Sequence, residues 1–266
     1  MNSRVALVTG AARGIGAATV LALAGAGWSV LAVDSAADDP ALPYPMATPA
    51  DLSEVVRRAG GAAGAGPVRS FVADVRDPDA VAAAVAEAER HWGGLDAAVA
   101  AAGVIAGGVP LWEVPPARQQ AVLDVNLGGV LSLARAAIPA LLRRPVPRSG
   151  RFLAVASAAA TRGLPMLAAY CAAKAGVTGL IRALGAELAD SGVTANAVSP
   201  GSTATPILDE SARLYRLPGA EAFAGQQPAG RLLDPAEVAA VLAFLAGPAS
   251  SGMTGAVVPV DGGLAL

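Results

Sequence analysis

Tyr170 and Lys174 are the two residues of this sequence whose types and spacing best suit proton transfer. The chain has eighteen arginines but one lysine, and that lysine follows Tyr170 by four positions. On a helix, residues i and i+4 lie on one face with Cβ atoms roughly 5–6 Å apart. A free phenol has a pKa of about 10, and a nearby ammonium favours the phenolate. The pair is a candidate general base with its activating cation, although a surface lysine one turn from a core tyrosine has the same spacing.

A glycine-rich turn near the start of the sequence is suited to binding a dinucleotide. It follows the apolar run Val5–Thr9 and opens a helical pattern. Glycines let the backbone approach a pyrophosphate, and a helix N-terminus supplies amide donors and the positive end of a dipole. Tight strand-to-helix turns also use glycine for geometry alone, but the strand before and the helix after favour nucleotide binding. The candidate contacts are Gly10, Arg13, Gly14, Ile15 and Gly16.

Two aspartates stand where neighbouring strands are expected to end. Asp34 follows Gly16 by eighteen residues, a position from which a carboxylate accepts hydrogen bonds from the adenosine ribose and repels a 2′-phosphate, which favours NAD over NADP. Asp74, in the pair Asp74-Val75, could accept a hydrogen bond from the adenine amino group. A turn-forming aspartate is the alternative at both positions, and at Asp74 it is nearly as plausible.

Short apolar runs alternate with helical patterns along the whole chain, which predicts an α/β fold: a doubly wound parallel sheet of Rossmann type, with helices on both faces. We expect a single domain over residues 1–266, interrupted by a proline-rich loop over 35–48 and an irregular stretch over 202–231. The expected helices lie near 14–26, 49–59, 78–91, 115–143, 168–190 and 234–246. The seven expected strands are Val5–Thr9, Ser29–Val33, Val68–Ala73, Ala97–Ala101, Arg151–Ala156, Thr194–Ser199 and Ala256–Val260.

The composition argues against several classes of function. The formal net charge is −2 and aromatic residues are few, so neither nucleic acid nor an anionic membrane is an expected partner. One cysteine and one histidine do not provide a Cys/His metal site, so no metal is expected. The chain enters its first strand at Val5 and its longest charge-free stretch, Ala97–Trp112, is shorter than the ~20 residues of a spanning helix. We therefore expect a cytoplasmic protein.

Taken together, the motifs resemble those of the short-chain dehydrogenase/reductase family over almost the whole chain. The glycine turn and Tyr170-x-x-x-Lys174 match the cofactor turn and the catalytic pair of that family, and Val260-Asp261-Gly262-Gly263 resembles its C-terminal strand and turn. One segment departs from the pattern, because Ala100-Ala101-Ala102-Gly103 lacks the usual asparagines, which puts a sheet-stabilising hydrogen bond in doubt. The resemblance further assigns catalytic roles to Asn126 and Ser157, and cofactor contacts to Ala102, Gly103, Tyr170, Lys174, Pro200, Gly201, Thr203 and Thr205.

The resemblance implies oxidation of an alcohol by hydride transfer to NAD. Tyr170 would take the hydroxyl proton, and Lys174 would lower its pKa and hold the nicotinamide ribose. Ser157 would donate to the substrate oxygen, and Asn126 would link Lys174 to solvent through a water. Because burial raises the pKa of a phenol, Lys174 and the cationic nicotinamide ring would together have to outweigh desolvation.

Residues 35–48, here called the insertion, lengthen the path from Asp34 to Asp74 by ~12 residues relative to ordinary connections. The segment Asp38–Thr48 resembles the insertion of mycofactocin-associated members of the family, as do Ala100–Val104 and Ser199–Thr205. This resemblance implies a tightly held nicotinamide and electron transfer to the peptide-derived carrier mycofactocin. A solvent-exposed loop without effect on cofactor exchange is the alternative.

The substrate remains open at this stage. Apolar residues in Pro206–Phe223 fit either a lid over a small hydrophobic or alicyclic secondary alcohol or an ordinary surface helix packed on the core. Three hypotheses remain: a dehydrogenase with retained NAD, a conventional dehydrogenase or ketoreductase with exchangeable NAD(H), and a noncatalytic nucleotide-binding protein. The family resemblance also implies a homotetramer, assembled through the helices near 115–143 and 168–190.

Overall fold

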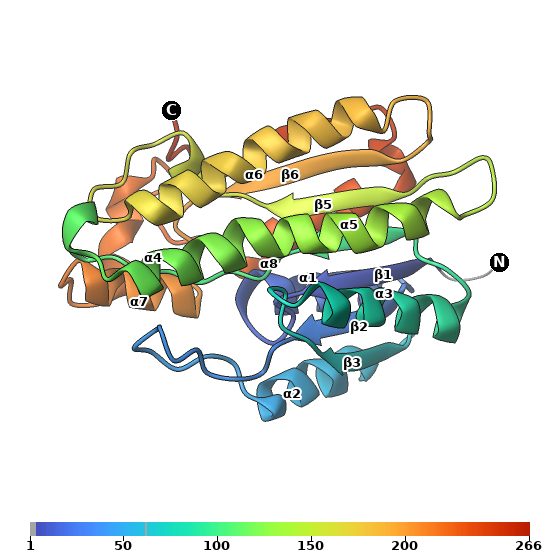
Figure 1. Ribbon diagram of the computed structural model, residues 1–266, viewed down its shortest axis with the longest axis horizontal. Helices are drawn as coiled ribbons and strands as arrows, with labels where there is room; N and C mark the ends of the chain where they lie inside the picture. Colours follow the sequence, from blue (N-terminus) through green and yellow to red (C-terminus); the bar gives the residue numbers. More distant parts are fainter. Residues whose placement is uncertain (1–3, 62) are drawn as a thin grey trace.

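The computed structural model describes residues 4–61 and 63–266, and within these ranges seven strands form one parallel sheet (Figure 1). The strand order is β3-β2-β1-β4-β5-β6-β7, and every neighbouring pair is parallel. This arrangement confirms the predicted doubly wound Rossmann-type fold. The strands are β1 (Val5–Thr9), β2 (Ser29–Asp34), β3 (Val68–Val72), β4 (Ala97–Ala100), β5 (Arg151–Val155), β6 (Thr194–Pro200) and β7 (Val257–Val260).

Helices cover both faces of the sheet, and each face has its own apolar cluster. One cluster joins the sheet to α3 (Pro78–Trp92), α5 (Gly129–Leu142) and α6 (Ala168–Glu187). The other joins it to α1 (Gly14–Gly25), α2 (Pro49–Gly60) and α8 (Pro235–Ala246). The central strands are buried on both sides, which explains why their sequences are continuous apolar runs rather than alternating ones.

Helix starts follow local sequence signals. Thr48 opens α2 with a capping box to Asp51, and Asp234 opens α8 with a capping box to Glu237. Asp77 accepts from the first turn of α3, and all three helices carry proline at the start. By contrast, no side chain caps α1, so its first amide groups are left for another acceptor.

The helix expected over 115–143 is interrupted, and this prediction was wrong in detail. The chain forms α4 (Pro116–Leu123), then a π-helical turn (Asp124–Gly128), then α5. A π turn shifts the helical register by one residue and often marks a functional site. Asn126 lies in this turn and is completely buried.

Other differences from the predicted elements are small, with one exception. Strand ends move by one residue, and α6 ends three residues before the expected position. The exception is α7 (Pro206–Leu214), which was not among the expected helices; Thr205 caps it and it begins at a proline. It lies at the carboxyl end of the sheet (Figure 1).

Next to the segment that lacks the asparagines, Thr9 bonds the chain after β4. The Ala101 amide donates to the Thr9 hydroxyl over 3.3 Å, which ties the ends of β1 and β4 together. The helical run 116–142 is long and apolar enough to cross a membrane by length and composition alone, but half of its most apolar window is buried against the rest of the protein, as in a core helix.

Candidate active site

A cavity of about 740 Å³ opens at the carboxyl ends of the parallel strands, where doubly wound folds bind their ligands. Every cofactor residue expected from the sequence lines it, and so do Ser157, Tyr170 and Lys174. Asn126 does not line the cavity, although its neighbour Val125 does. The chain thus brings residues from all parts of the sequence to one edge of the sheet.

The glycine turn is shaped by close backbone contacts. Gly10 has a φ of +66°, and a Cβ there would lie 2.6 Å from the Cα of Ala102, so only glycine fits. The following residues lead into the uncapped start of α1, whose amides face a cavity with room for an anionic group. These features fit a dinucleotide pyrophosphate.

Asp34 is positioned by two backbone amides. Its carboxylate accepts from the amides of Ala12 and Ala36 at 3.1 and 3.0 Å. These bonds fix the carboxylate at the end of β2, on the cavity wall. A negative charge held there suits ribose hydroxyls and opposes a phosphate at the same place.

Asp74 is engaged by Arg76, a contact that was not expected from the sequence. The Arg76 guanidinium lies 2.6 Å from Asp74 and also 2.6 Å from Asp39 of the insertion. Burial alone would raise the pKa of Asp74, but the hydrogen bonds from Arg76 outweigh it and hold the pKa below its usual value. Asp74 therefore stays ionised beside the expected adenine position, and Arg76 joins it to the insertion.

Tyr170 and Lys174 lie together at the centre of the cavity wall. The Lys174 Nζ is 5.7 Å from the centroid of the Tyr170 ring and donates to the Val155 carbonyl over 2.8 Å. Burial raises the pKa of Tyr170, and a hydrogen bond with the Ser157 hydroxyl offsets part of that rise. Burial also lowers the pKa of Lys174 to about 8. The geometry suits proton transfer, but without a further positive charge the phenol remains protonated.

Asn126 sits behind this pair and uses its whole side-chain amide within the protein. Its Nδ2 donates to the carbonyls of Val104 and Val122, each at 2.8 Å, and its Oδ1 accepts from the Val104 amide at 3.3 Å. The side chain therefore anchors the segment after β4 and has no hydrogen left for a water. The Oδ1 atom has a second lone pair that could accept from a water, and the relay through Asn126 stays a prediction.

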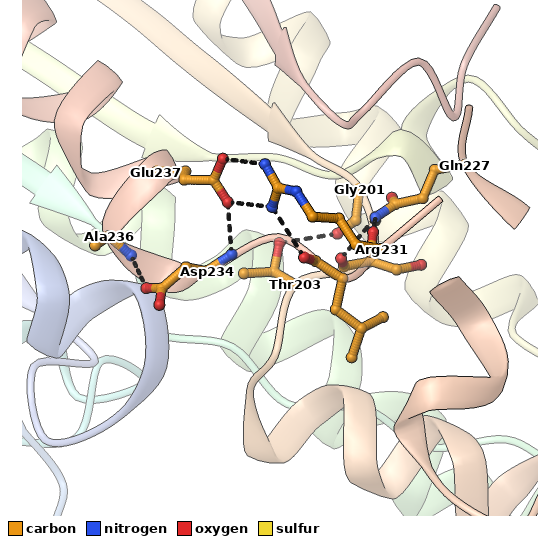
Figure 2. A network of polar contacts seen from close by, with 9 residues as sticks. Gly201, Thr203, Gln227, Arg231, Asp234, Ala236 and Glu237 are labelled. Atoms are coloured by element: carbon orange, nitrogen blue, oxygen red, sulfur yellow. Dashed lines mark hydrogen bonds and ion pairs between the residues drawn. The ribbon is translucent and has the colours of Figure 1, made fainter. Parts of the chain in front are cut away.

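The loop after β6 is held by a polar network (Figure 2). Gln227 is buried and bonds both the amide and the carbonyl of Ser202, at 3.0 and 3.1 Å. Arg231 pairs with Glu237 at 2.7 Å, which fixes the end of this stretch on α8. A Cβ on Gly201 would lie 2.6 Å from the Gln227 Oε1. The expected contacts Pro200, Gly201, Thr203 and Thr205 are thereby fixed along the cavity wall.

The insertion packs on the molecule rather than extending into solvent. Tyr44 accepts a hydrogen bond from the Ile105 amide at 2.9 Å, and burial raises the pKa of Tyr44 to about 12. The Arg13 guanidinium donates to the Pro45 carbonyl over 3.2 Å. With the Asp39–Arg76 pair, these contacts attach the insertion to the glycine turn and to the segments after β3 and β4.

The stretch 202–231 contains α7 and a short 3₁₀ helix (Ala220–Gln226), and both line the cavity. Tyr215 packs edge-on against Phe223 with centroids 6.1 Å apart, and its hydroxyl donates to the Pro165 carbonyl over 2.6 Å. This stretch therefore covers the part of the cavity beyond Tyr170, opposite the end occupied by Asp34.

Three cavity or insertion residues were missed by the sequence reasoning: Tyr44, Arg76 and Arg162. No sequence motif marks them. Tyr44 and Arg162 bond residues that are distant in sequence, and Arg76 bonds Asp39, which lies 37 residues away. An arginine two residues after Asp74 was the one available signal, since it is close enough to pair with that carboxylate.

Fold and site together define an oxidoreductase with a dinucleotide site. The model of the family described as enoyl-(acyl carrier protein) reductase matches residues 10–265. Cis-4-hydroxycyclohexanecarboxylate dehydrogenase of Sinomonas cyclohexanicum is 39% identical, over 98% of this chain and 96% of that protein. Among solved structures, carveol dehydrogenase from Mycobacterium avium in complex with NAD has a TM-score of 0.90 and 33% identity, over 98% of this chain and 97% of that one. Levodione reductase has a TM-score of 0.89 and 30% identity, with the same coverage.

The chain belongs to the short-chain dehydrogenase/reductase family. It is one of the nicotinamide-dependent enzymes of that family, as the resemblance of its motifs implied.

Proposed function

We propose that this enzyme interconverts a small, largely apolar secondary alcohol and its ketone, with NAD as the cofactor and Tyr170 as the acid/base. The observation that carries the proposal is the convergence of Ser157, Tyr170 and Lys174 on one cavity with the glycine turn. NAD rather than NADP is supported by the fixed carboxylate of Asp34. Relatives named as NAD-dependent oxidoreductases, and a neighbour in complex with NAD, support the same choice.

Different segments of the chain would bind the different parts of the cofactor. The start of α1 would bind the pyrophosphate, Asp34 the ribose, and the segment after β3 the adenine. Gly201, Thr203 and Thr205 would contact the nicotinamide end, with Lys174 on its ribose. When bound, NAD accepts or supplies the hydride.

Tyr170 then handles the proton. In alcohol oxidation its phenolate takes the hydroxyl proton, and in ketone reduction the phenol returns it. Ser157 donates to the substrate oxygen and stabilises charge that develops there. Lys174 holds positive charge close to the Tyr170 ring, which favours the phenolate against the effect of burial.

A ring-shaped substrate is supported by the part of the cavity beyond Tyr170. Leu164, Leu167, Ile207, Leu217 and Phe223 line it with apolar surface. Relatives and structural neighbours named for cyclohexane-derived or terpene substrates point in the same direction. We therefore place the substrate among alicyclic secondary alcohols.

We further propose that NAD is tightly held and that mycofactocin reoxidises it. The support is the insertion, which is attached by Arg13 to the glycine turn, by the Asp39–Arg76 pair to the segment after β3, and by Tyr44 to the segment after β4. Prolines in the insertion lower the entropy lost when it orders, which would slow cofactor release. The protein is proposed to act as a cytoplasmic homotetramer, as the family resemblance implies.

Native mass spectrometry of the purified protein, with an absorbance spectrum before and after alcohol addition, tests these statements together. We expect bound nicotinamide, its reduction by an alicyclic alcohol, and little turnover with free NAD unless an external electron acceptor is added. Rapid turnover with free NAD would assign the enzyme to the conventional class with exchangeable cofactor. No hydride transfer across a broad panel of alcohols and ketones would rule out the proposed activity.

A further inference from the structure

The part of the cavity beyond Tyr170, here called the substrate end, carries an arginine that the proposed mechanism does not use. Arg162 lies five residues after Ser157, in the loop between β5 and α6, and lines the cavity. Its Nη1 donates to the Leu264 carbonyl over 2.7 Å. None of the ion pairs found within residues 4–61 and 63–266 includes Arg162. Its charge therefore has no carboxylate partner there.

The carboxylates that line the cavity are confined to one end of it, where Arg13 and Arg76 also lie. Four carboxylates line it, and all belong to the adenosine end: Asp34 at the end of β2, Asp38 and Asp39 in the insertion, and Asp74 after β3. At the substrate end, the charged lining residues of the described chain are Arg162 and Lys174. A substrate entering this end meets positive charge without a competing carboxylate, which favours an anion.

The walls around Arg162 are apolar. Leu164 and Pro165 follow it in the same loop, and Leu217, Phe223 and Leu264 come from the covering stretch and the C-terminal segment. Such a surface suits a hydrocarbon ring, whereas a guanidinium suits an oxyanion. The two features together describe an amphipathic ligand, apolar in its body and negatively charged at one end.

Arg162 is an exposed residue, but its loop and one nitrogen of its guanidinium are tied to the rest of the chain. The Arg162 amide donates to the Ala158 carbonyl over 2.9 Å. The Tyr215 hydroxyl bonds the carbonyl of Pro165 three residues later. The guanidinium donates one hydrogen bond to the Leu264 carbonyl. Its remaining N–H groups can donate two parallel hydrogen bonds to a carboxylate.

We propose that Arg162 binds a carboxylate of the substrate, so that the enzyme acts on alicyclic hydroxy acids and the corresponding keto acids. This inference rests on the proposed oxidoreductase function and narrows its substrate class. Arg162 binds one end of the substrate, while Tyr170 and Ser157 bind the alcohol oxygen at the other. The apolar walls between them hold the ring.

The kinetic test compares a hydroxycyclohexane that carries a carboxylate with the matched carboxamide, which has nearly the same shape but no charge. We expect the wild type to favour the acid, mostly through a lower KM. Arg162→Gln should lower kcat/KM for the acid by roughly 10- to 100-fold, as expected for a lost hydrogen-bonded charge contact, and leave the amide nearly unchanged. Arg58→Gln makes the same change on the exposed surface of α2, outside the cavity, and serves as the control.

A binding measurement makes the test independent of catalysis. Cyclohexanecarboxylate has no hydroxyl to oxidise, so calorimetry can compare its affinity with that of cyclohexanecarboxamide for the protein with its nucleotide bound. Equal affinities in the wild type, or an equal loss of both ligands in Arg162→Gln, would overturn the inference. Oxidation of neutral cyclohexanols without any preference for the acid would also overturn it while leaving the proposed function intact. Absence of all alcohol oxidation would instead refute the proposed function.

Discussion

Tyr170 is subject to two opposing influences on its pKa. Burial raises the pKa, and the hydrogen bond with Ser157 lowers it by less. The Lys174 ammonium, 5.7 Å from the ring centroid, favours the phenolate. In the proposed mechanism the positive charge of the oxidised nicotinamide would favour the phenolate further. Proton transfer would then be coupled to the presence of NAD.

Replacing the phenol hydroxyl tests the acid/base role. Tyr170→Phe should reduce turnover by about 10²–10⁴-fold, because a positioned general acid/base contributes a factor of that size. The affinity for NAD should remain close to that of the wild type, since most of the expected cofactor contacts come from other residues that line the cavity. Steady-state assays and calorimetry with NAD measure the two properties. Turnover preserved in the variant would remove Tyr170 from the mechanism.

The buried Lys174 predicts an unusual dependence of stability on pH. Burial lowers its folded pKa to about 8, against an ordinary value of 10.5. Between these values the unfolded state binds more protons, so the free energy of unfolding increases with pH. From pH 8 to pH 10 the gain should be roughly 2 kcal/mol in nucleotide-free protein. Denaturant unfolding of the wild type and of Lys174→Met measures it, and the same pH dependence in both would contradict this account.

Individual site residues differed in how far the sequence could predict them. Tyr170 and Lys174 could be paired because helix geometry fixes the spacing i to i+4. Tyr44 and Arg162 could not, because their partners Ile105 and Leu264 lie 61 and 102 residues away. Such contacts depend on how loops pack, and no local periodicity encodes that packing.

At the scale of elements, the insertion is the feature with the most direct functional consequence. Arg76 joins it to the segment after β3 through Asp39, which is itself buried. Arg76→Gln should accelerate NAD dissociation by roughly tenfold or more, because changes at one interface act mainly on dissociation rates. Exchange of bound NAD for an isotopically labelled form, followed by mass spectrometry, measures the rate.

A matched variant separates this effect from a general loss of charge. Arg90→Gln on α3 removes an arginine that pairs with Glu87 outside the cavity, so its exchange rate should equal that of the wild type. Equal rates in Arg76→Gln and in the wild type would show that the Asp39–Arg76 contact does not retain the cofactor.

The π turn shows where element prediction from sequence stops. The apolar pattern over 115–143 is helical throughout, and α4 and α5 do form there. The register shift at Asp124–Gly128 accompanies the burial of Asn126, whose side chain bonds the Val104 backbone. That bond joins residues 22 positions apart, so the interruption arises from tertiary contact. The sequence of α7 likewise fits either a lid or a surface helix, because the contacts that place it on the cavity wall are tertiary.

For the whole molecule, the alternation of apolar runs and helical patterns was sufficient to predict the sheet, because parallel strands need crossover helices. The number of subunits could not be predicted in the same way, because it depends on which exposed side chains meet between subunits. Leu131 on α5 is 46% exposed in the single chain, on one of the helices expected to join subunits.

Leu131→Glu should therefore convert the proposed homotetramer to a smaller species, because a charge would be buried at the interface. Native mass spectrometry measures the mass of each assembly. Val146→Glu, at a position 75% exposed and outside the helices, provides the control. A wild type that is monomeric at micromolar concentration would refute the homotetramer.

The strand order also bears on synthesis of the protein. β1 is translated first, yet it pairs with β4 as well as β2, and the cavity is closed only by the loop after β6 near residue 200. Three-quarters of the chain must leave the ribosome before a dinucleotide can be enclosed. If release is as slow as proposed, each subunit captures its nicotinamide once, late in folding, and the supply of NAD at that moment decides how much active enzyme a cell obtains.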